Sequence, residues 1–197
     1  MLAVAAGAER MTQAMRSLEA AFLIGVEGVT EIWLVRHGDC YEGMAEGADP
    51  PLSPAGRRQA ERLADRVRKV GARVIYSSPY RRAVETARII GHEVREDPRL
   101  VEIELELGED GTLDFKEPAT SVVERMHAAI NEIVAAHTGE HVVVVTHGVA
   151  LMAYLSDVLR LAPGQMRLLP YFTSVSVVRA LGDVRMVGSI ADTAHLE

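Results

Sequence analysis

The sequence predicts an α/β fold, a three-layer α/β/α sandwich around a mostly parallel sheet with an extra N-terminal helix. Two short apolar runs, residues 32–35 and 142–145, suit strands that are buried on both faces and are too brief for helices. Helical segments alternate with strand-like segments along the chain, which is typical of parallel strands joined by crossover helices. Because no repeat or linker interrupts this alternation, we expect residues 1–197 to form a single domain.

An amphipathic helix is expected near the N-terminus, over residues 11–24. Its apolar positions recur at helical spacing, at Met11, Met15, Leu18 and Phe22. In this interpretation residues 1–28 form a helical extension and residues 29–190 form the catalytic core. We expect the helix to pack on the domain's own core, with a dimerisation arm as the alternative. Met11 is also an alternative start codon.

Cap signals predict where the next helices begin. Ser53-Pro54 offers an N-cap and a first-turn proline for a helix that runs to about residue 70. Ser78-Pro79 repeats this signal for a helix through about residue 90. Residues 121–124 match a capping box, which predicts a helix that continues to about residue 137.

Hydrophobic patterning predicts the remaining elements. We expect a short strand at residues 73–77, a helix at 149–159 and a closing hairpin of residues 174–180 and 184–190. Residues 100–107 alternate strictly between apolar and acidic side chains, which indicates a half-exposed strand or an extended segment at the rim. Its carboxylates would then share one face: Glu102, Glu104 and Glu106.

Composition and charge exclude several classes of protein. A chain that is 48% hydrophobic can bury a sizeable core and is not disordered. The net charge of −7 argues against nucleic acid or an anionic membrane as the main partner, and no apolar run approaches the roughly 18 residues needed to span a bilayer. Cys40 is the single cysteine, which excludes an intramolecular disulfide and suits a reducing compartment. We therefore expect a cytoplasmic protein.

Both buried runs end in a histidine followed by a glycine, as Arg36-His37-Gly38 and as His147-Gly148. In parallel sheets the carboxyl ends of strands share one edge, which is where ligands bind. A neutral imidazole is a competent nucleophile toward phosphorus when a hydrogen bond fixes one ring nitrogen, and a neighbouring arginine holds phosphate oxygens in pairs. Glycine lets the backbone approach the bound group. The pattern therefore points to phosphoryl transfer through a phosphohistidine.

Other parts of the chain supply the remaining chemistry. Arg82 falls in the first turn of a predicted helix, where free N–H groups and the helix dipole favour an anion, and Arg81 beside it is expected at the substrate rim. As an imidazolium, His147 would stabilise the oxygens of the transferring group. The leaving oxygen needs a proton donor, and the three glutamates of residues 100–107 are the candidates.

These motifs, in this order, resemble those of the histidine phosphatase superfamily, the phosphoglycerate mutase-like group, in its phosphatase branch. The resemblance covers roughly residues 31–190 and rests on four motifs: Val35-Arg36-His37-Gly38, Ser78-Pro79-Tyr80-Arg81-Arg82-Ala83, Leu100-Val101-Glu102-Ile103 and Val145-Thr146-His147-Gly148. It implies a three-layer α/β fold and no metal or organic cofactor. It also implies a phosphohistidine at His37, with Glu102 as the acid and phosphate contacts from Arg36, Arg82 and His147.

The chain departs from the family pattern at two places. Gly43 stands where the family often has a phosphate-contacting asparagine. The family also often places a glycine four residues after the acidic glutamate. Counting back from Gly108 selects Glu104, whereas the preceding Leu100-Val101 selects Glu102, which we favour.

The favoured function is a phosphomonoester hydrolase that acts on a small molecule, with substrate contacts from Arg36, Gly38, Arg82, His147 and Gly148. The first alternative is a cofactor-dependent phosphoglycerate-type mutase, which would need segments that cover the intermediate, and residues 108–118 are the only loop available after the acidic run. The second is a non-catalytic phosphate-binding regulator on the same fold. A homodimer is left open.

Overall fold

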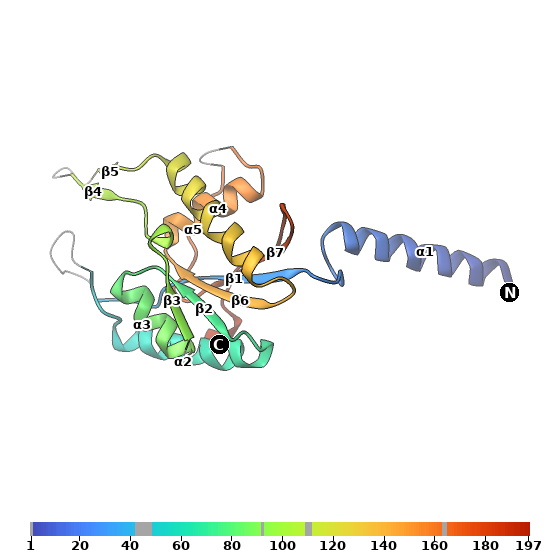
Figure 1. Ribbon diagram of the computed structural model, residues 1–197, viewed down its shortest axis with the longest axis horizontal. Coiled ribbons are helices and arrows are strands. Elements are labelled where there is room, and N and C mark those ends of the chain that lie inside the picture. Colours follow the sequence, from blue (N-terminus) through green and yellow to red (C-terminus); the bar gives the residue numbers. More distant parts are fainter. Residues whose placement is uncertain (1, 42–48, 92, 109–111, 163–164) are drawn as a thin grey trace.

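A six-stranded sheet forms the centre of the protein (Figure 1). The structure is a computed structural model and describes residues 2–41, 49–91, 93–108, 112–162 and 165–197. The strands lie in the order β3-β2-β6-β1-β7-β8. Their bounds are β1 Thr30–Arg36, β2 Val74–Ser77, β3 Glu93–Glu96, β6 His141–Thr146, β7 Val175–Leu181 and β8 Val184–Asp192.

The neighbouring strands β3, β2, β6 and β1 run parallel, and the hairpin of β7 and β8 adds an antiparallel edge next to β1. Val145 of β6 is in register with Val35 of β1 on one side and with Ser77 of β2 on the other. The carboxyl ends of these three strands therefore meet at one edge of the sheet. The predicted fold class and the closing hairpin are confirmed.

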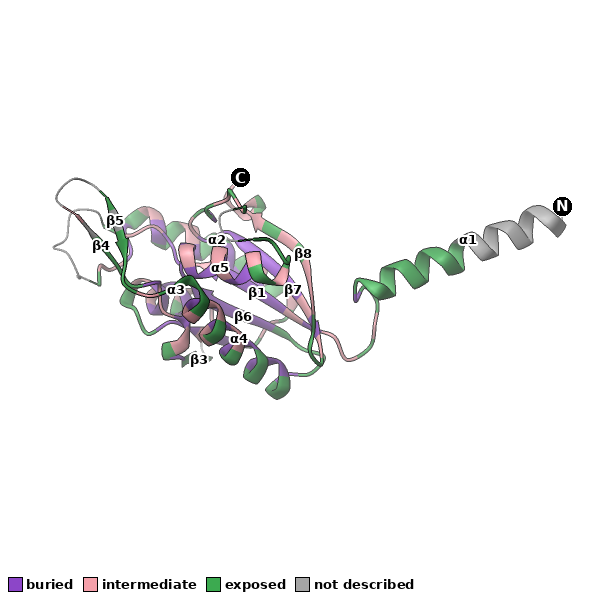
Figure 2. Ribbon diagram, turned by 90° about the horizontal axis from the view of Figure 1, so that it is seen from above, coloured by how far each residue is buried: buried purple, intermediate pink, exposed green. Residues whose placement is uncertain are grey.

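Two pairs of helices cover the sheet, α2 (Pro54–Val70) with α3 (Arg81–Ile90) and α4 (Ala119–Ala136) with α5 (Gly148–Val158). Successive residues of β1 point to opposite faces, so Trp33 and Val35 pack in the cluster that contains Leu63 of α2. Ile32 and Leu34 pack in the other cluster, among buried side chains of α4 and α5 such as Ile130 and Tyr154. Figure 2 shows the buried strands between the helical layers.

The predicted cap of α2 is confirmed. Ser53 adopts an extended conformation, its hydroxyl accepts a hydrogen bond from the N–H of Gly56 at 3.0 Å, and Pro54 is the first helical residue. Gly71 ends the helix with φ at 74°, in the left-handed region that glycine adopts without strain.

The cap predicted at Ser78 is wrong, because α3 begins later, at Arg81, with Tyr80 as an N-cap that makes no side-chain bond. The hydroxyl of Ser78 still accepts a hydrogen bond from the N–H of Tyr80, at 3.3 Å, but its other contact is to His147. A long-range contact has therefore taken the side chain that the local pattern assigned to capping.

The capping box predicted at residues 121–124 is also wrong, since α4 begins at Ala119 with Pro118 as its N-cap. The hydroxyl of Ser121 donates to the carboxylate of Glu117 at 3.1 Å instead. The guanidinium of Arg125 binds the same carboxylate, with contacts of 2.8 and 3.0 Å. Glu117, which precedes the helix, thus binds two side chains near the start of α4, Ser121 and Arg125.

Residues 100–107 form a strand only at their end. Leu100 closes a 3₁₀ turn, η1 (Pro98–Leu100), and β4 (Leu105–Leu107) pairs with the short β5 (Leu113–Phe115). Glu102 is half-buried, while Glu104 and Glu106 are exposed. The three carboxylates therefore do not share one face. Neither β5 nor the polar edge strand β3 was predicted.

The N-terminal helix α1 (Leu2–Ala21) extends away from the rest of the protein (Figures 1 and 2). Met15, Leu18 and Phe22 are each about half exposed, so the expectation that this helix packs on the domain's own core is wrong. Leu23, which is buried and has φ at 57°, turns the chain toward β1. Across the described residues, no helix is both long and apolar enough to cross a membrane.

Candidate active site

The sheet edge brings the two predicted histidines together. The N–H of His37 donates to the carbonyl of Thr146 at 2.9 Å, which continues the pairing of β1 and β6 one residue beyond the strands. The N–H of Ser78 donates to the carbonyl of Val145 at 2.9 Å and does the same for β2. As a result, the rings of His37 and His147 lie with their centroids 5.1 Å apart.

The ring of His37 is held in one orientation by a contact at each nitrogen. Nδ1 lies 2.8 Å from the carbonyl oxygen of Gly38, and Nε2 accepts a hydrogen bond from Nε of Arg82 at 3.3 Å. Both contacts require the same tautomer, in which Nδ1 carries the proton and Nε2 has a lone pair. The residue is 5% exposed, and burial, with the charges of Arg82 and Arg36, lowers the pKa of His37 from 6.5 to about 3. The imidazole is therefore neutral at physiological pH.

The segment between α5 and β7 holds the side chain of Arg36 in place. Its Nη1 donates to the carbonyl of Pro170 at 2.8 Å, and its guanidinium lies 4.1 Å from the centroid of the Phe172 ring. The buried Nε has no hydrogen-bond partner among the described residues. Burial lowers the pKa of Arg36 from its usual value, and the carboxylate of Glu102 opposes that shift. This leaves a buried N–H donor for a ligand oxygen.

The segment that carries Phe172 is tied to the C-terminus. The N–H of Thr173 donates to the carbonyl of Arg36 at 3.0 Å. Its hydroxyl lies 2.7 Å from the carbonyl of Phe172 and 3.1 Å from Nε2 of His195, which belongs to the short 3₁₀ turn η2 (Ala194–Leu196). The last turn of the chain thus supports the segment on which Arg36 rests.

Arg82 is the second residue of α3, so it lies in the first turn of a helix, as predicted, and its side chain is 15% exposed. Thr86, one turn further along, links this helix to the histidine loop. Its hydroxyl accepts from the N–H of Gly38 at 2.9 Å and donates to the carbonyl of Arg82 at 2.7 Å. A Cβ at position 38 would lie 2.8 Å from the carbonyl oxygen of Gly56, so glycine is required for this close approach.

His147 is fully buried and its pKa lies well below 6.5, because of burial and the charge of Arg82. The predicted imidazolium is therefore wrong for this structure, where the ring is neutral. Its Nε2 lies 2.8 Å from the hydroxyl of Ser78, which also accepts from the N–H of Tyr80 and still has both a donor and a second acceptor position for the ring. Nδ1 is buried and has no partner among the described residues, and it is a second free donor in the tautomer in which Ser78 donates to Nε2.

Gly148 follows this histidine and begins α5. A Cβ at position 148 would lie 3.0 Å from Leu169 and 3.3 Å from Nε of Arg36. The glycine therefore leaves space for the guanidinium beside the imidazole.

Glu102 lies at the N-terminus of α5, the helix that begins directly after His147. Its carboxylate accepts hydrogen bonds from the N–H groups of Val149 at 3.1 Å and Ala150 at 2.8 Å, as well as from Ile103 at 2.9 Å. Glu104 is exposed and makes no comparable contact with α5 among the described residues. These contacts thus place Glu102 at the start of the helix that follows His147.

The other residues singled out in the sequence lie at the edge of this site or outside it. Arg81 is exposed and its Nε donates to Glu85 at 2.9 Å. Burial raises the pKa of the Cys40 thiol, which disfavours the nucleophilic thiolate. Gly43, where the family asparagine is missing, lies outside the described residues. Glu106 pairs with Lys116 at 3.0 Å.

Comparison with known proteins decides the family. A family model described as the histidine phosphatase superfamily (branch 1) matches residues 32–117 and 106–193. The chain belongs to the histidine phosphatase superfamily. The probable phosphoglycerate mutase GpmB of Proteus mirabilis, a similar protein, is 32% identical over 207 residues, which cover 82% of this chain and 96% of that one.

Solved structures of superfamily proteins share the fold. YhfR of Bacillus stearothermophilus matches with a TM-score of 0.75 and 28% identity, over 85% of this chain and 100% of that chain. A phosphoserine phosphatase from Entamoeba histolytica, in complex with 3-phosphoglyceric acid, matches with a TM-score of 0.74 and 22% identity, over 85% of this chain and 100% of that chain. The second likeness concerns the fold alone.

Sequence reasoning missed Phe172, Ser78 as a partner of His147, and Thr86. No local pattern marks Phe172, because its role comes from a contact across 136 positions of sequence. Within the described parts of the chain, no group of three or more His, Cys, Asp or Glu side chains is arranged to hold a metal ion.

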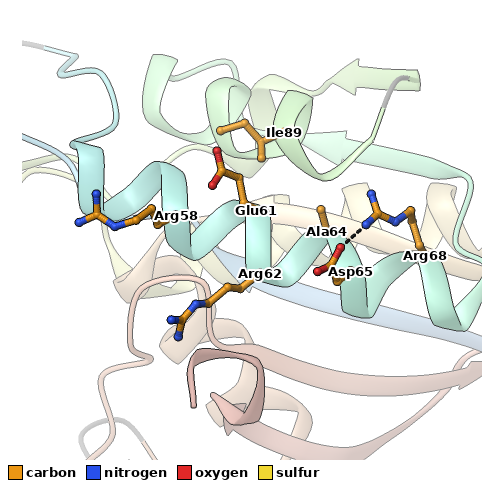
Figure 3. A pocket seen from close by; sticks show the side chains of 7 residues that line it. All are labelled: Arg58, Glu61, Arg62, Ala64, Asp65, Arg68 and Ile89. Carbon is orange, nitrogen blue, oxygen red and sulfur yellow. Dashed lines mark hydrogen bonds and ion pairs between the residues drawn. The ribbon is translucent and has the colours of Figure 1, made fainter.

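A groove of about 450 Å³ lies elsewhere, along α2 (Figure 3). None of the site residues lines it, and Arg68 and Asp65 form an ion pair within it. Its lining residues are Arg58, Glu61, Arg62, Ala64, Asp65, Arg68 and Ile89.

Proposed function

We propose that this protein is a phosphomonoester hydrolase that works through a phosphohistidine on His37. The observation that carries the proposal is the state of that ring. A neutral imidazole has its proton fixed at Nδ1 by Gly38 and presents the lone pair of Nε2 next to Arg82. Nε of Arg36 and Nδ1 of His147 are buried and unpartnered among the described residues, and both are suited to the oxygens of a phosphoryl group when Nδ1 carries the proton.

In the first step, Nε2 of His37 attacks phosphorus. The N–P bond forms as the bond from phosphorus to the ester oxygen breaks, and Arg82 turns from the ring nitrogen to a phosphoryl oxygen. Glu102, as the general acid, gives a proton to the departing alkoxide. The fixed guanidinium and N–H donors stabilise the charge that spreads over the phosphoryl oxygens.

In the second step, the carboxylate of Glu102 takes a proton from water as the water oxygen attacks phosphorus. The N–P bond breaks, its electron pair returns to Nε2, and inorganic phosphate leaves. The bond from Nδ1 to Gly38 is kept throughout, so His37 begins and ends as the same tautomer.

A phosphoglycerate-type mutase is the second candidate, and the name of the relatives such as GpmB favours it. A mutase must keep water away from the phosphohistidine, which needs segments that cover it. Among the described residues after Glu102, the short pair β4 and β5 and the segment that carries Phe172 are the candidates for this. A purely regulatory role is disfavoured, because a binding module does not need an activated nucleophile.

Rapid quenching with ³²P-labelled phosphomonoesters tests the proposal. We expect acid-labile, alkali-stable label on the wild type, release of inorganic phosphate, and loss of both in His37→Ala. His141→Ala, on the exposed end of β6, is the matched control and should keep both. Label that persists in His37→Ala contradicts the nucleophile. Conversion of 3-phosphoglycerate to 2-phosphoglycerate without phosphate release, stimulated by 2,3-bisphosphoglycerate, indicates the mutase instead.

A further inference from the structure

A carboxylate lies on the cationic side of the site. Oδ1 of Asp49 accepts a hydrogen bond from Nη1 of Arg82 at 3.3 Å, and Oδ2 accepts from the backbone N–H of Arg81 at 2.5 Å. Nε of the same Arg82 guanidinium lies 3.3 Å from Nε2 of His37. A single guanidinium therefore separates the carboxylate of Asp49 from the nitrogen proposed to receive the phosphoryl group.

Asp49 has an anchor that does not depend on the side chain of Arg82. Arg81 is the first residue of α3, so its N–H is one of the donors that a helix leaves unpaired at its N-terminus, where the dipole also favours an anion. This bond can hold the carboxylate in place when Arg82 turns to a phosphate oxygen. The side chain of Asp49 is 40% exposed, so a group on a bound substrate can reach it.

Two further arginines near the start of α3 share one carboxylate. Arg57 and Arg81 both bind the carboxylate of Glu85, at 2.8 and 2.9 Å. The substrate phosphate, a dianion, would take up the two positive charges of Arg36 and Arg82. Asp49 would then lose its ion pair with Arg82, and its carboxylate would be available to the alcohol part of the substrate.

We propose that Asp49 selects the substrate class. It favours phosphomonoesters whose alcohol part carries hydroxyl or ammonium groups near the phosphate, and it rejects those with a carboxylate there. This inference rests on the proposed hydrolysis at His37. An ionised carboxylate can only accept hydrogen bonds, so it pairs with a hydroxyl or ammonium and repels a second anion. After screening by solvent at a half-exposed site, we expect a discrimination of about tenfold, which corresponds to about 1.4 kcal/mol.

Glycerol 3-phosphate and 3-phosphoglycerate form a matched pair for the test, since they differ only in a hydroxymethyl group against a carboxylate. The wild type should favour glycerol 3-phosphate by about tenfold in kcat/KM, and Asp49→Asn should reduce this ratio to about twofold or less. If Asp49→Asn also makes the side chain of Arg82 more mobile, both substrates are affected, and this effect cancels in the ratio of their kcat/KM values. Asp65→Asn makes the same charge change on α2, where Asp65 pairs with Arg68, and should keep the tenfold ratio (Figure 3).

A wild type that hydrolyses 3-phosphoglycerate as well as glycerol 3-phosphate, or an unchanged ratio in Asp49→Asn, would overturn the inference and leave hydrolysis intact. If neither ester releases phosphate, the proposed function fails, and calorimetric titration of both esters into the wild type decides the role of Asp49. A tenfold tighter Kd for glycerol 3-phosphate that Asp49→Asn abolishes supports the inference, and equal Kd values refute it. The wild-type measurements stand even if the variant does not fold.

Discussion

Acid should destabilise this protein well above the pH at which its carboxylates are protonated, because His37 is buried in its neutral form. Its pKa is about 3 in the folded protein against an ordinary 6.5. Below pH 6.5 the unfolded chain binds this proton and the folded chain does not, so the free energy of unfolding falls as the pH falls. Above pH 6.5 neither state is protonated and the effect is absent. Below about pH 3 both states are protonated and the loss is complete.

The magnitude follows from the shift. Each pH unit between 6.5 and 3 removes about 1.4 kcal/mol, so His37 alone costs about 2 kcal/mol at pH 5. His147 acts in the same direction, since its pKa is also lowered by burial. Carboxylates contribute little at pH 5. For example, although burial raises it, hydrogen bonds from Arg99 keep the pKa of Asp97 below 3.8.

Urea unfolding at pH 7 and pH 5 measures this loss. In His37→Gln the loss of unfolding free energy between pH 7 and pH 5 should be smaller than in the wild type by about 2 kcal/mol, whatever the stability of the variant at pH 7. His141→Gln makes the same substitution at the exposed end of β6 and should lose as much as the wild type. If His37→Gln loses as much stability as the wild type between the two pH values, the imidazole is not buried as a neutral base and the basis of the proposed nucleophile is wrong.

Three further predictions concern the general acid, the independence of turnover from metal ions, and the N-terminal helix α1. Glu102→Gln should lower kcat for alkyl phosphates about 100-fold and for p-nitrophenyl phosphate much less, because phenolate leaves without a proton, and Glu104→Gln should do neither; the reverse pattern would assign the acid to Glu104. Turnover should survive exhaustive treatment with EDTA, and loss that a divalent ion restores would contradict neutralisation of the phosphate by arginine. Removal of residues 1–21 should leave kcat/KM and the unfolding midpoint unchanged, since α1 extends away from the sheet, and a lower midpoint would show that it packs on the core.

The sequence was most informative where local and long-range demands agree. Residues 32–35 are apolar on both faces of β1 because helices cover both sides of the strand. The local hydrophobic pattern and the burial in the fold therefore favour the same element. The His-Gly pairs at the strand ends likewise located the site, since parallel register carries His37 and His147 to one edge. Ser53 caps its helix because its hydroxyl donates to the carboxylate of Asp39 and can still accept from the N–H of Gly56 in the first turn.

Prediction failed where a tertiary contact decided the outcome. Ser78 has the chemistry of an N-cap, but its hydroxyl serves an imidazole that lies 69 positions away in the chain. The polar strand β3 has no hydrophobic period, because it is an edge strand held by backbone pairing to β2. The apolar face of α1 suggested a helix packed on the core, yet periodicity does not say what covers such a face. Phe172 acts on Arg36 only through the fold.

The support that His195 gives to Thr173 has a practical consequence for handling the protein. An affinity tag or a resin linkage added after Glu197 would be attached two residues from that contact, and strain there would pass to the segment beneath Arg36. At the other end of the described chain, α1 extends away from the sheet (Figure 1). Immobilisation and fluorescent labelling therefore belong at the N-terminus, where α1 acts as a built-in spacer.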